Sequence, residues 1–153
     1  MFETETQRYL RRLQRTPAQC EAENIARDQL ERVFNLPAPA DLQMVAEIAS
    51  AVACADLGIP EQRVIEIPAG AHIGIAGFPA AGPTSHVIHV RLEGKCPCRV
   101  AEIAAHEVRH RWQYVTEKFS EMLGRNETEP DAYGYDGDFF QRFLAGRCRW
   151  CGR

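Results

Sequence analysis

Apolar residues recur at a helical period in the first part of the chain. Thr16 can cap a helix, Pro17 suits the first turn and Gln19 can bond back to the N–H of the cap, so this stretch predicts a helix start. A following helix is expected to begin after Asp41 and to end at Gly58. The apolar positions that define these two helices are Ile25, Leu30, Val33, Phe34, Leu42, Val45, Ile48, Ala49, Val52 and Ala53.

Short, strand-like runs replace this pattern beyond Gly58. Three strands are predicted, at Arg63–Pro68, His72–Phe78 and Ser85–Leu92, with glycine and proline marking the bends between them. A long helix is then predicted over Arg99–Phe119.

The C-terminal part of the chain predicts further helical segments. Gly124 and Asn126 break the long helix, and Thr128 with Asp131 has the pattern of a capping box that starts the next one. A last short helix is expected over Asp138–Ala145.

The composition favours a single domain. The chain has 153 residues and a mass of 17.2 kDa, with 45% hydrophobic and 25% charged residues, which is the usual mix for a soluble globular protein. We expect an α+β fold with N-terminal helices, a small three-stranded twisted sheet, a long helix and a C-terminal helical segment. These parts correspond to residues 1–58, 63–92, 99–119 and 128–153.

Charge and targeting signals narrow the classes of partner. The net charge of −3 gives no argument for binding to nucleic acid or to an anionic membrane. No apolar run approaches the roughly 20 residues of a membrane span, and the first fifteen residues lack the apolar core of a secretory signal. Six cysteines are few for a disulfide scaffold of this length. We therefore expect a cytoplasmic protein without a membrane partner.

The segment that points to chemistry is the HExxH motif formed by His106, Glu107 and His110 on the long predicted helix. Residues four apart on a helix lie about 40° apart, so the two imidazoles share one face, as two ligands of a zinc ion must. Glu107 is turned by about 100° from His106 and can reach a water bound to that ion. The motif predicts a zinc site in which Glu107 is the general base.

A hydrolytic zinc site needs a third protein ligand and an open position. No histidine follows His110, so we expect a carboxylate from the next helical segment. Three are available, namely Glu127, Glu129 and Asp131. A carboxylate that does not bind the metal could instead accept the ring N–H of a ligating histidine.

These residues resemble those of a known family. The sequence HEVRH, followed by Trp112-Gln113 and then by Glu129-x-Asp131-Ala132-x-x-Tyr135, is similar to the small gluzincin-type zinc metallopeptidases, which include the ImmA/IrrE-like proteins and other short bacterial and phage HExxH proteins. The resemblance implies a zincin-like fold, peptidase activity and Glu129 as the third zinc ligand. The pattern of larger gluzincins would instead select Glu127 together with Asp131.

The resemblance also implies a mechanism. Glu107 would accept a proton from the zinc-bound water and pass it to the leaving amine. Candidates for the side chain that stabilises the oxyanion are Tyr133, Tyr135 and His89. By resemblance, Ser85–Leu92 would lie along the cleft and pair with an extended substrate.

Two close cysteine pairs suggest a second metal site. Cys96 and Cys98 form one pair, Cys148 and Cys151 the other, and four thiolates can hold a structural zinc ion. Free thiols, a disulfide between the pairs and a redox couple are the alternatives. The remaining cysteines, Cys20 and Cys54, are expected in the core.

The function predicted from the sequence is that of a zinc-dependent metallohydrolase acting on a peptide or protein substrate. The alternative is a non-catalytic zinc-binding module that regulates or binds a partner on the same scaffold. Neither the substrate specificity nor the oligomeric state is indicated by the sequence.

Overall fold

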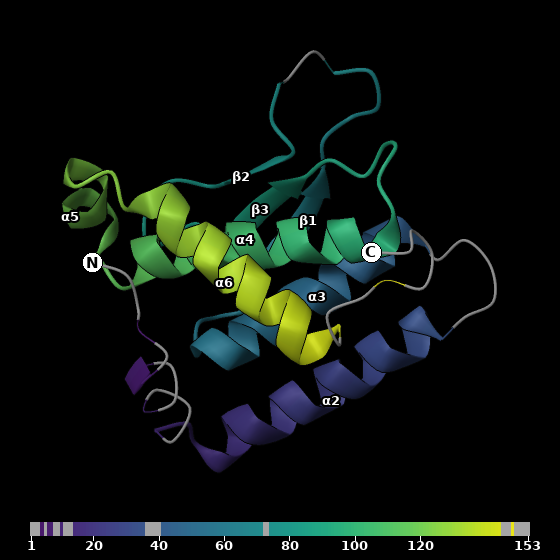
Figure 1. The fold of residues 1–153 in the computed structure, drawn as a ribbon, viewed down its shortest axis with the longest axis horizontal. Helices are drawn as coiled ribbons and strands as arrows, with labels where there is room; N and C mark the ends of the chain where they lie inside the picture. The colour runs from purple at the N-terminus through teal and green to yellow at the C-terminus, as the bar shows by residue number, and fades with distance from the viewer. Residues whose placement is uncertain are drawn as a thin grey trace.

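Five helices and a three-stranded sheet make up the part of the chain that the computed structural model describes (Figure 1), namely residues 14–35, 41–71 and 74–144 with residues 4, 6, 7, 10 and 148. The elements are α2 (Pro17–Phe34), α3 (Leu42–Leu57), β1 (Arg63–Glu66), β2 (Gly77–Pro79), β3 (Val87–Val90), α4 (Pro97–Val115), α5 (Phe119–Gly124) and α6 (Thr128–Phe143). The predicted α+β class is confirmed. Most of the first thirteen residues of the expected helical part lie outside the described residues.

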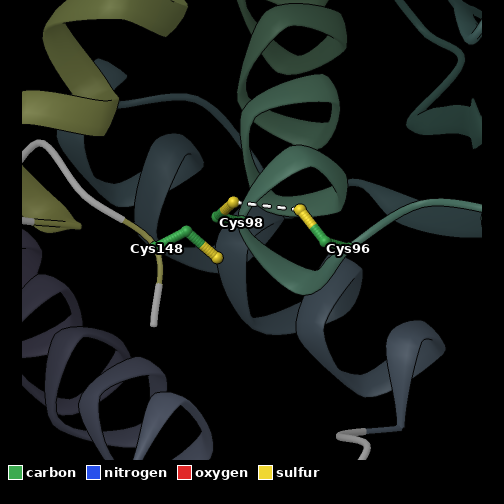
Figure 2. Close-up of side chains that lie close together, drawn as sticks. All are labelled: Cys96, Cys98 and Cys148. Carbon is green, nitrogen blue, oxygen red and sulfur yellow. Dashed lines mark hydrogen bonds between the residues drawn. The ribbon is translucent and has the colours of Figure 1, made fainter. Parts of the chain in front are cut away.

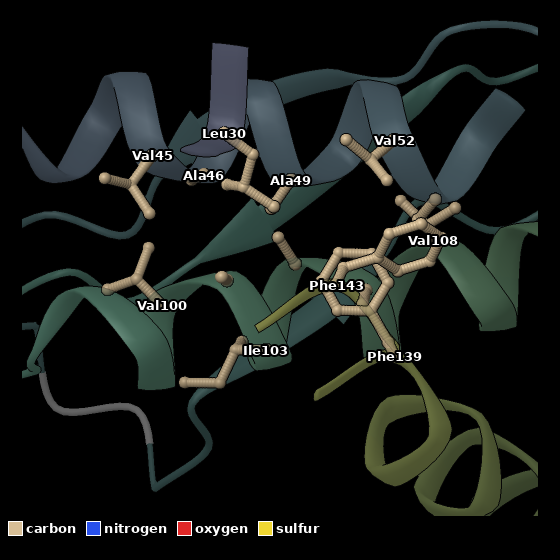
Figure 3. Packing of buried hydrophobic residues seen from close by; sticks show 14 of the residues in the cluster. Leu30, Val45, Ala46, Ala49, Val52, Val100, Ile103, Val108, Phe139 and Phe143 are labelled. Carbon is tan, nitrogen blue, oxygen red and sulfur yellow. The ribbon is translucent and has the colours of Figure 1, made fainter. Parts of the chain in front are cut away.

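Helix α4 is the element around which the others pack. It contacts α3 and α6 as well as strands β2 and β3, while α2 packs on α3 (Figure 1). The core between these helices contains apolar side chains from four of them (Figure 3), namely Leu30, Val45, Ala46, Ala49, Val52, Val100, Ile103, Val108, Phe139 and Phe143. Most residues of α4 are therefore buried.

The predicted limits of the first helices agree with the structure. Thr16 and Gln19 form the reciprocal capping box at the start of α2. Asp41 caps α3, and Gly58 ends that helix with a left-handed φ of 68°. Ile25 was expected on the buried face of α2, but it is 54% exposed. The buried face contains the next residue, Ala26, which lies about 100° further around the helix.

The sheet has the order β1-β3-β2. Strand β1 runs parallel to β3, and β2 runs antiparallel to it. The prediction of three strands is confirmed, but the strand expected over His72–Phe78 is shorter. Residues 74–76 form no strand, and residues 72 and 73 lie outside the described residues. The expectation that Ser85–Leu92 pairs with an extended substrate is wrong, because β3 is the central strand and already pairs on both sides, while β2 lies at the edge.

Helix α4 is displaced toward the N-terminus relative to the predicted Arg99–Phe119. It begins at Pro97, whose ring suits the first helical turn. It ends at Val115 because the chain then turns: Glu117 adopts a left-handed φ of 60°, and the N–H of Lys118 donates to the carbonyl of Gln113.

Helix α6 is one continuous helix, whereas two segments were predicted. Its buried residues Phe139, Phe140 and Phe143 carry the helix past the position where the last short helix was expected to start. The predicted capping box of Thr128 and Asp131 is absent: Glu127 occupies the cap position of α6 without a capping hydrogen bond from its side chain, and the Asp131 carboxylate binds Arg109.

A buried ion network joins α3 to α6. The carboxylate of Asp56, fully buried, accepts hydrogen bonds from Arg142 (2.7 and 3.1 Å), from Arg15 (3.3 Å) and from the Tyr135 hydroxyl (2.8 Å). Burial alone would lower the pKa of Arg142, but the hydrogen bond to Asp56 and the charge of Asp56 raise it above the usual value.

No helix of the described residues is sufficiently long and apolar to span a bilayer.

Replacing Asp56 with asparagine should lower the free energy of unfolding by about 3 kcal/mol, because two arginines lose a buried counter-charge. Chemical denaturation measures this change. The matched control is Asp138→Asn, whose half-buried carboxylate binds the same Arg142 at 2.8 Å. That substitution should cost about 0.5 kcal/mol. Equal decreases in the free energy of unfolding of the two variants would contradict the prediction that the buried carboxylate of Asp56 stabilises the fold more than that of Asp138.

Candidate metal centre

Three side chains of the predicted site converge. One turn of α4 separates His106 from His110, and their Nε2 atoms lie 3.2 Å apart. Glu129, in the first turn of α6, places one carboxylate oxygen 2.8 Å from Nε2 of His110 and the other 3.3 Å from Nε2 of His106. The imidazoles are buried, while Glu129 is exposed. The ligand atoms all lie within 4.8 Å of one another, so these residues form a group that could hold a metal ion.

Hydrogen bonds on the far side of each imidazole orient the rings. Nδ1 of His106 lies 2.9 Å from a carboxylate oxygen of Asp136, and Nδ1 of His110 lies 2.9 Å from Oε1 of Gln113. The Gln113 amide donates through Nε2 to the carbonyl of Thr128 and to Asp131, so its oxygen faces His110. Both acceptors require a proton on Nδ1, which leaves the lone pair on each Nε2.

This arrangement of lone pairs needs a positive charge between them. Two imidazole nitrogens with free lone pairs and a carboxylate are all acceptors, and acceptors at such distances repel one another unless a proton or a metal ion lies between them. Burial alone would lower the pKa of His106, but the hydrogen bond to Asp136 and nearby carboxylates raise it. Burial and the neighbouring His106 lower the pKa of His110. The donor set fits Zn²⁺, which binds histidine nitrogen and carboxylate oxygen.

Glu107 lies beside this group and faces the same cavity. Burial, with smaller contributions from Glu129 and Asp136, raises the pKa of Glu107 to about 7, although the charge of His106 opposes the shift. Its Oε2 atom is buried and has no hydrogen-bond partner among the described residues. A buried carboxylate oxygen without a partner is costly, which indicates a role toward a molecule bound in the cavity.

The cavity has a volume of about 430 Å³ and lies between α4, α6 and the edge strand β2. Its walls are formed by Gly74, Ile75, Ala76, Gly77, Phe78, Pro79, Arg99, Ile103, His106, Glu107, His110, Glu129, Tyr133 and Asp136. The lining from β2 and the residues before it is thus largely apolar, while α4 and α6 contribute the candidate ligands and Glu107.

The tyrosines expected near the oxyanion have different surroundings. Tyr133 lines the cavity, is 60% exposed and stacks at a tilt on His106, with ring centroids 4.6 Å apart. Tyr135 is not available for this role, since it is buried and its hydroxyl donates to Asp56. His89 stacks on Phe78 outside the cavity walls, and burial lowers its pKa.

Asp131 and Glu127, the alternative third ligands, are not part of the group formed with the two histidines. Asp131 forms a buried, two-bond ion pair with Arg109, at 2.8 and 2.9 Å, and also accepts from Gln113. It therefore supports His110 indirectly. Glu127 occupies the cap position of α6 and is not part of the group. The group that could hold a metal ion contains Glu129 and neither of these two carboxylates.

Sequence reasoning missed Asp136 and Gln113, the two residues that orient the imidazoles. Their spacing carries the signal. Asp136 follows Glu129 by seven residues, which returns to nearly the same face of a helix, and Gln113 follows His110 by three. The break predicted between the two halves of α6 concealed the first of these relations.

Three of the cysteines lie close together in the structure. Cys96, Cys98 and Cys148 lie together and could hold a metal ion, whereas Cys151 lies outside the described residues. Cys54 is buried as expected, and burial raises its pKa to about 12. Cys20 was expected in the core but is exposed.

Comparison of the chain with models of protein families, with curated proteins and with solved structures found no match. The interpretation of the site therefore depends on its own residues and geometry.

Replacing Asp136 with alanine should weaken zinc binding by about 10- to 100-fold, because the His106 ring loses the acceptor that fixes its tautomer and orientation. Competition with a chromophoric chelator measures the affinity. The control is Asp138→Ala on the same helix, which does not line the cavity and should leave the affinity unchanged. A normal affinity in Asp136→Ala would show that the tautomer is fixed by other means.

Gly77 is predicted to tolerate no side chain. A Cβ atom there would lie 2.8 Å from the His89 carbonyl oxygen and 3.0 Å from Oε1 of Glu107. Gly77→Ala should lower the free energy of unfolding by about 1–3 kcal/mol. Gly134→Ala, on α6 with no atom within 4 Å of the added Cβ, should raise it by about 0.5–1 kcal/mol. Thermal unfolding compares the two, and a stabilised Gly77→Ala would show that β2 does not approach Glu107 closely.

Proposed function

We propose that this protein is a zinc-dependent metallohydrolase of the zincin type that cleaves peptides or proteins. His106, His110 and Glu129 would hold the zinc ion, and Glu107 would serve as the general base. The observation that carries the proposal is the convergence of two imidazole lone pairs and a carboxylate beside a second, buried carboxylate in one cavity. When bound, zinc supplies a Lewis acid with an open coordination position, which lowers the pKa of a water molecule there.

Glu107 is suited to proton transfer at neutral pH. A group with a pKa of about 7 can accept a proton from water and return it to a leaving amine without a large energetic penalty in either direction. Its burial also removes competing water from the carboxylate. The free Oε2 atom can take up the proton, since no neighbour among the described residues occupies it.

Other cavity residues have roles that follow from their positions. The Tyr133 hydroxyl, on an exposed ring beside His106, would donate a hydrogen bond to the oxyanion that forms during attack. The edge strand β2 takes the place that was expected for Ser85–Leu92, and an extended substrate would pair with it. The apolar wall near Ile75 and Phe78 would accept an apolar side chain of that substrate.

A non-catalytic zinc-binding module is the second candidate. It would use the same three ligands but would have no need of Glu107. Keeping its Oε2 atom buried without a hydrogen-bond partner among the described residues costs folding free energy, so the module explains less of the site than the hydrolase does.

The test is the substitution Glu107→Gln in the full-length protein. Cleavage of a fluorescently labelled unfolded protein should fall by at least about 100-fold, because the general base is lost. The zinc content, measured by elemental analysis, should stay unchanged. His106→Ala should lose both activity and this zinc ion.

The matched control is Glu121→Gln, which changes an exposed carboxylate on α5 and should leave both quantities unchanged. Full activity in Glu107→Gln would remove this residue as the base. A wild-type protein that binds zinc through His106 but cleaves neither this substrate nor a peptide library would favour the non-catalytic module.

A further inference from the structure

A second cluster of side chains that could bind a metal lies at the N-terminal end of α4, about two and a half turns before Glu107. Figure 2 shows Cys96, Cys98 and Cys148 around the first turn of that helix. Cys96 occupies the cap position of α4 and Cys98 lies in its first turn, while Cys148 follows the end of α6. Residues fifty positions apart in the sequence thus bring three thiols to one place.

The separations of the sulfur atoms suit a shared metal ion. Four thiolates at about 2.3 Å from a tetrahedral zinc ion lie about 3.8 Å from one another. The sulfur atoms of Cys96 and Cys98 are 3.1 Å apart, and all three sulfur atoms lie within 4.8 Å of one another. The expected value lies between these two limits, so small side-chain rotations would produce the coordination geometry. The structure contains no disulfide at these three residues.

The start of α4 favours negative charge. This helix of 19 residues begins without a side-chain cap and without an acidic residue in its first turn. The unsatisfied N–H groups and the helix dipole make such a terminus favourable for a negatively charged set of ligands. Thiolate is the form that binds metal.

Burial indicates a structural role. Cys98 is completely buried and Cys148 is 3% exposed, and both belong to the hydrophobic core. A site enclosed in this way leaves little room for a substrate or a metal-bound water. The sequence supplies a fourth thiol in Cys151, three residues after Cys148, although it lies outside the described residues.

We propose that Cys96, Cys98 and Cys148 bind a structural zinc ion, separate from the ion held by the histidines. Each thiol releases a proton to solvent when it binds. The ion would tie the segment after α6 to the start of α4. Because these two helices carry all three ligands of the candidate metal centre, the cysteine site would hold in register the elements that position it.

Elemental analysis of the full-length protein and of cysteine variants tests this site. Cys98→Ser and Cys148→Ser should each lose one zinc ion per chain, whereas the matched control Cys20→Ser, which changes an exposed cysteine on α2, should lose none. His106→Ala should retain the cysteine-bound ion. This last variant separates the two sites, since a failure of the proposed hydrolase would leave the loss in Cys98→Ser unchanged. An unchanged zinc content in Cys98→Ser and Cys148→Ser would overturn the proposal.

A second measurement uses chains with intact cysteines, because a cysteine variant that misfolds would lose zinc for another reason. Cobalt(II) introduced into His106→Ala should give the charge-transfer absorption of cobalt–thiolate bonds, which histidine and carboxylate ligands do not produce. Absence of that absorption would overturn the proposal. So would a disulfide among these residues, detected by mass spectrometry after alkylation of the unfolded, unreduced wild-type protein.

Discussion

The hydrogen bonds that Asp136 and Gln113 make to Nδ1 of the two imidazoles are the interactions on which the candidate site depends. They set the tautomer of each ring and thereby direct two lone pairs to one point, next to the carboxylate of Glu129. The HExxH spacing alone places the rings on one face of a helix without orienting them. The orientation comes from partners on the same helix and on α6, so the site exists only where α4 and α6 are docked correctly.

Buried polar contacts hold those two helices in place. Arg109 on α4 donates two buried hydrogen bonds to Asp131 on α6, and Asp131 also accepts a hydrogen bond from Gln113. A buried polar network of this kind favours one relative position of the two helices, because a shift of either helix would leave a buried charge without its partner. Asp56 does the same between α3 and α6. Apolar packing supplies the attraction between the helices, and these ion pairs select the register.

The sequence predicted the helices well where local signals agree. Thr16, Asp41 and Gly58 mark helix ends through contacts within a few residues, so their effect does not require knowledge of the fold. Prediction failed where a distant partner competes for the same group. Asp131 was expected to cap α6, but Arg109 binds its carboxylate. Tyr135 was expected at the cavity, but Asp56 holds its hydroxyl in the core. Strand order was also beyond local reasoning, since the central position of β3 results from pairing with strands on both sides.

From the chain of amino acids one can derive a pair of histidines on one helical face with a glutamate beside them, because helix geometry repeats at a known period. The sequence already offered Glu129, through the family resemblance, and a shared site for the cysteine pairs. The folded arrangement brings Glu129 rather than its acidic neighbours beside the histidines, places Asp136 at Nδ1 of His106 and gathers Cys148 with Cys96 and Cys98. These features join residues on separate elements, and their distances are set by how the helices pack rather than by the residues that adjoin them in the chain.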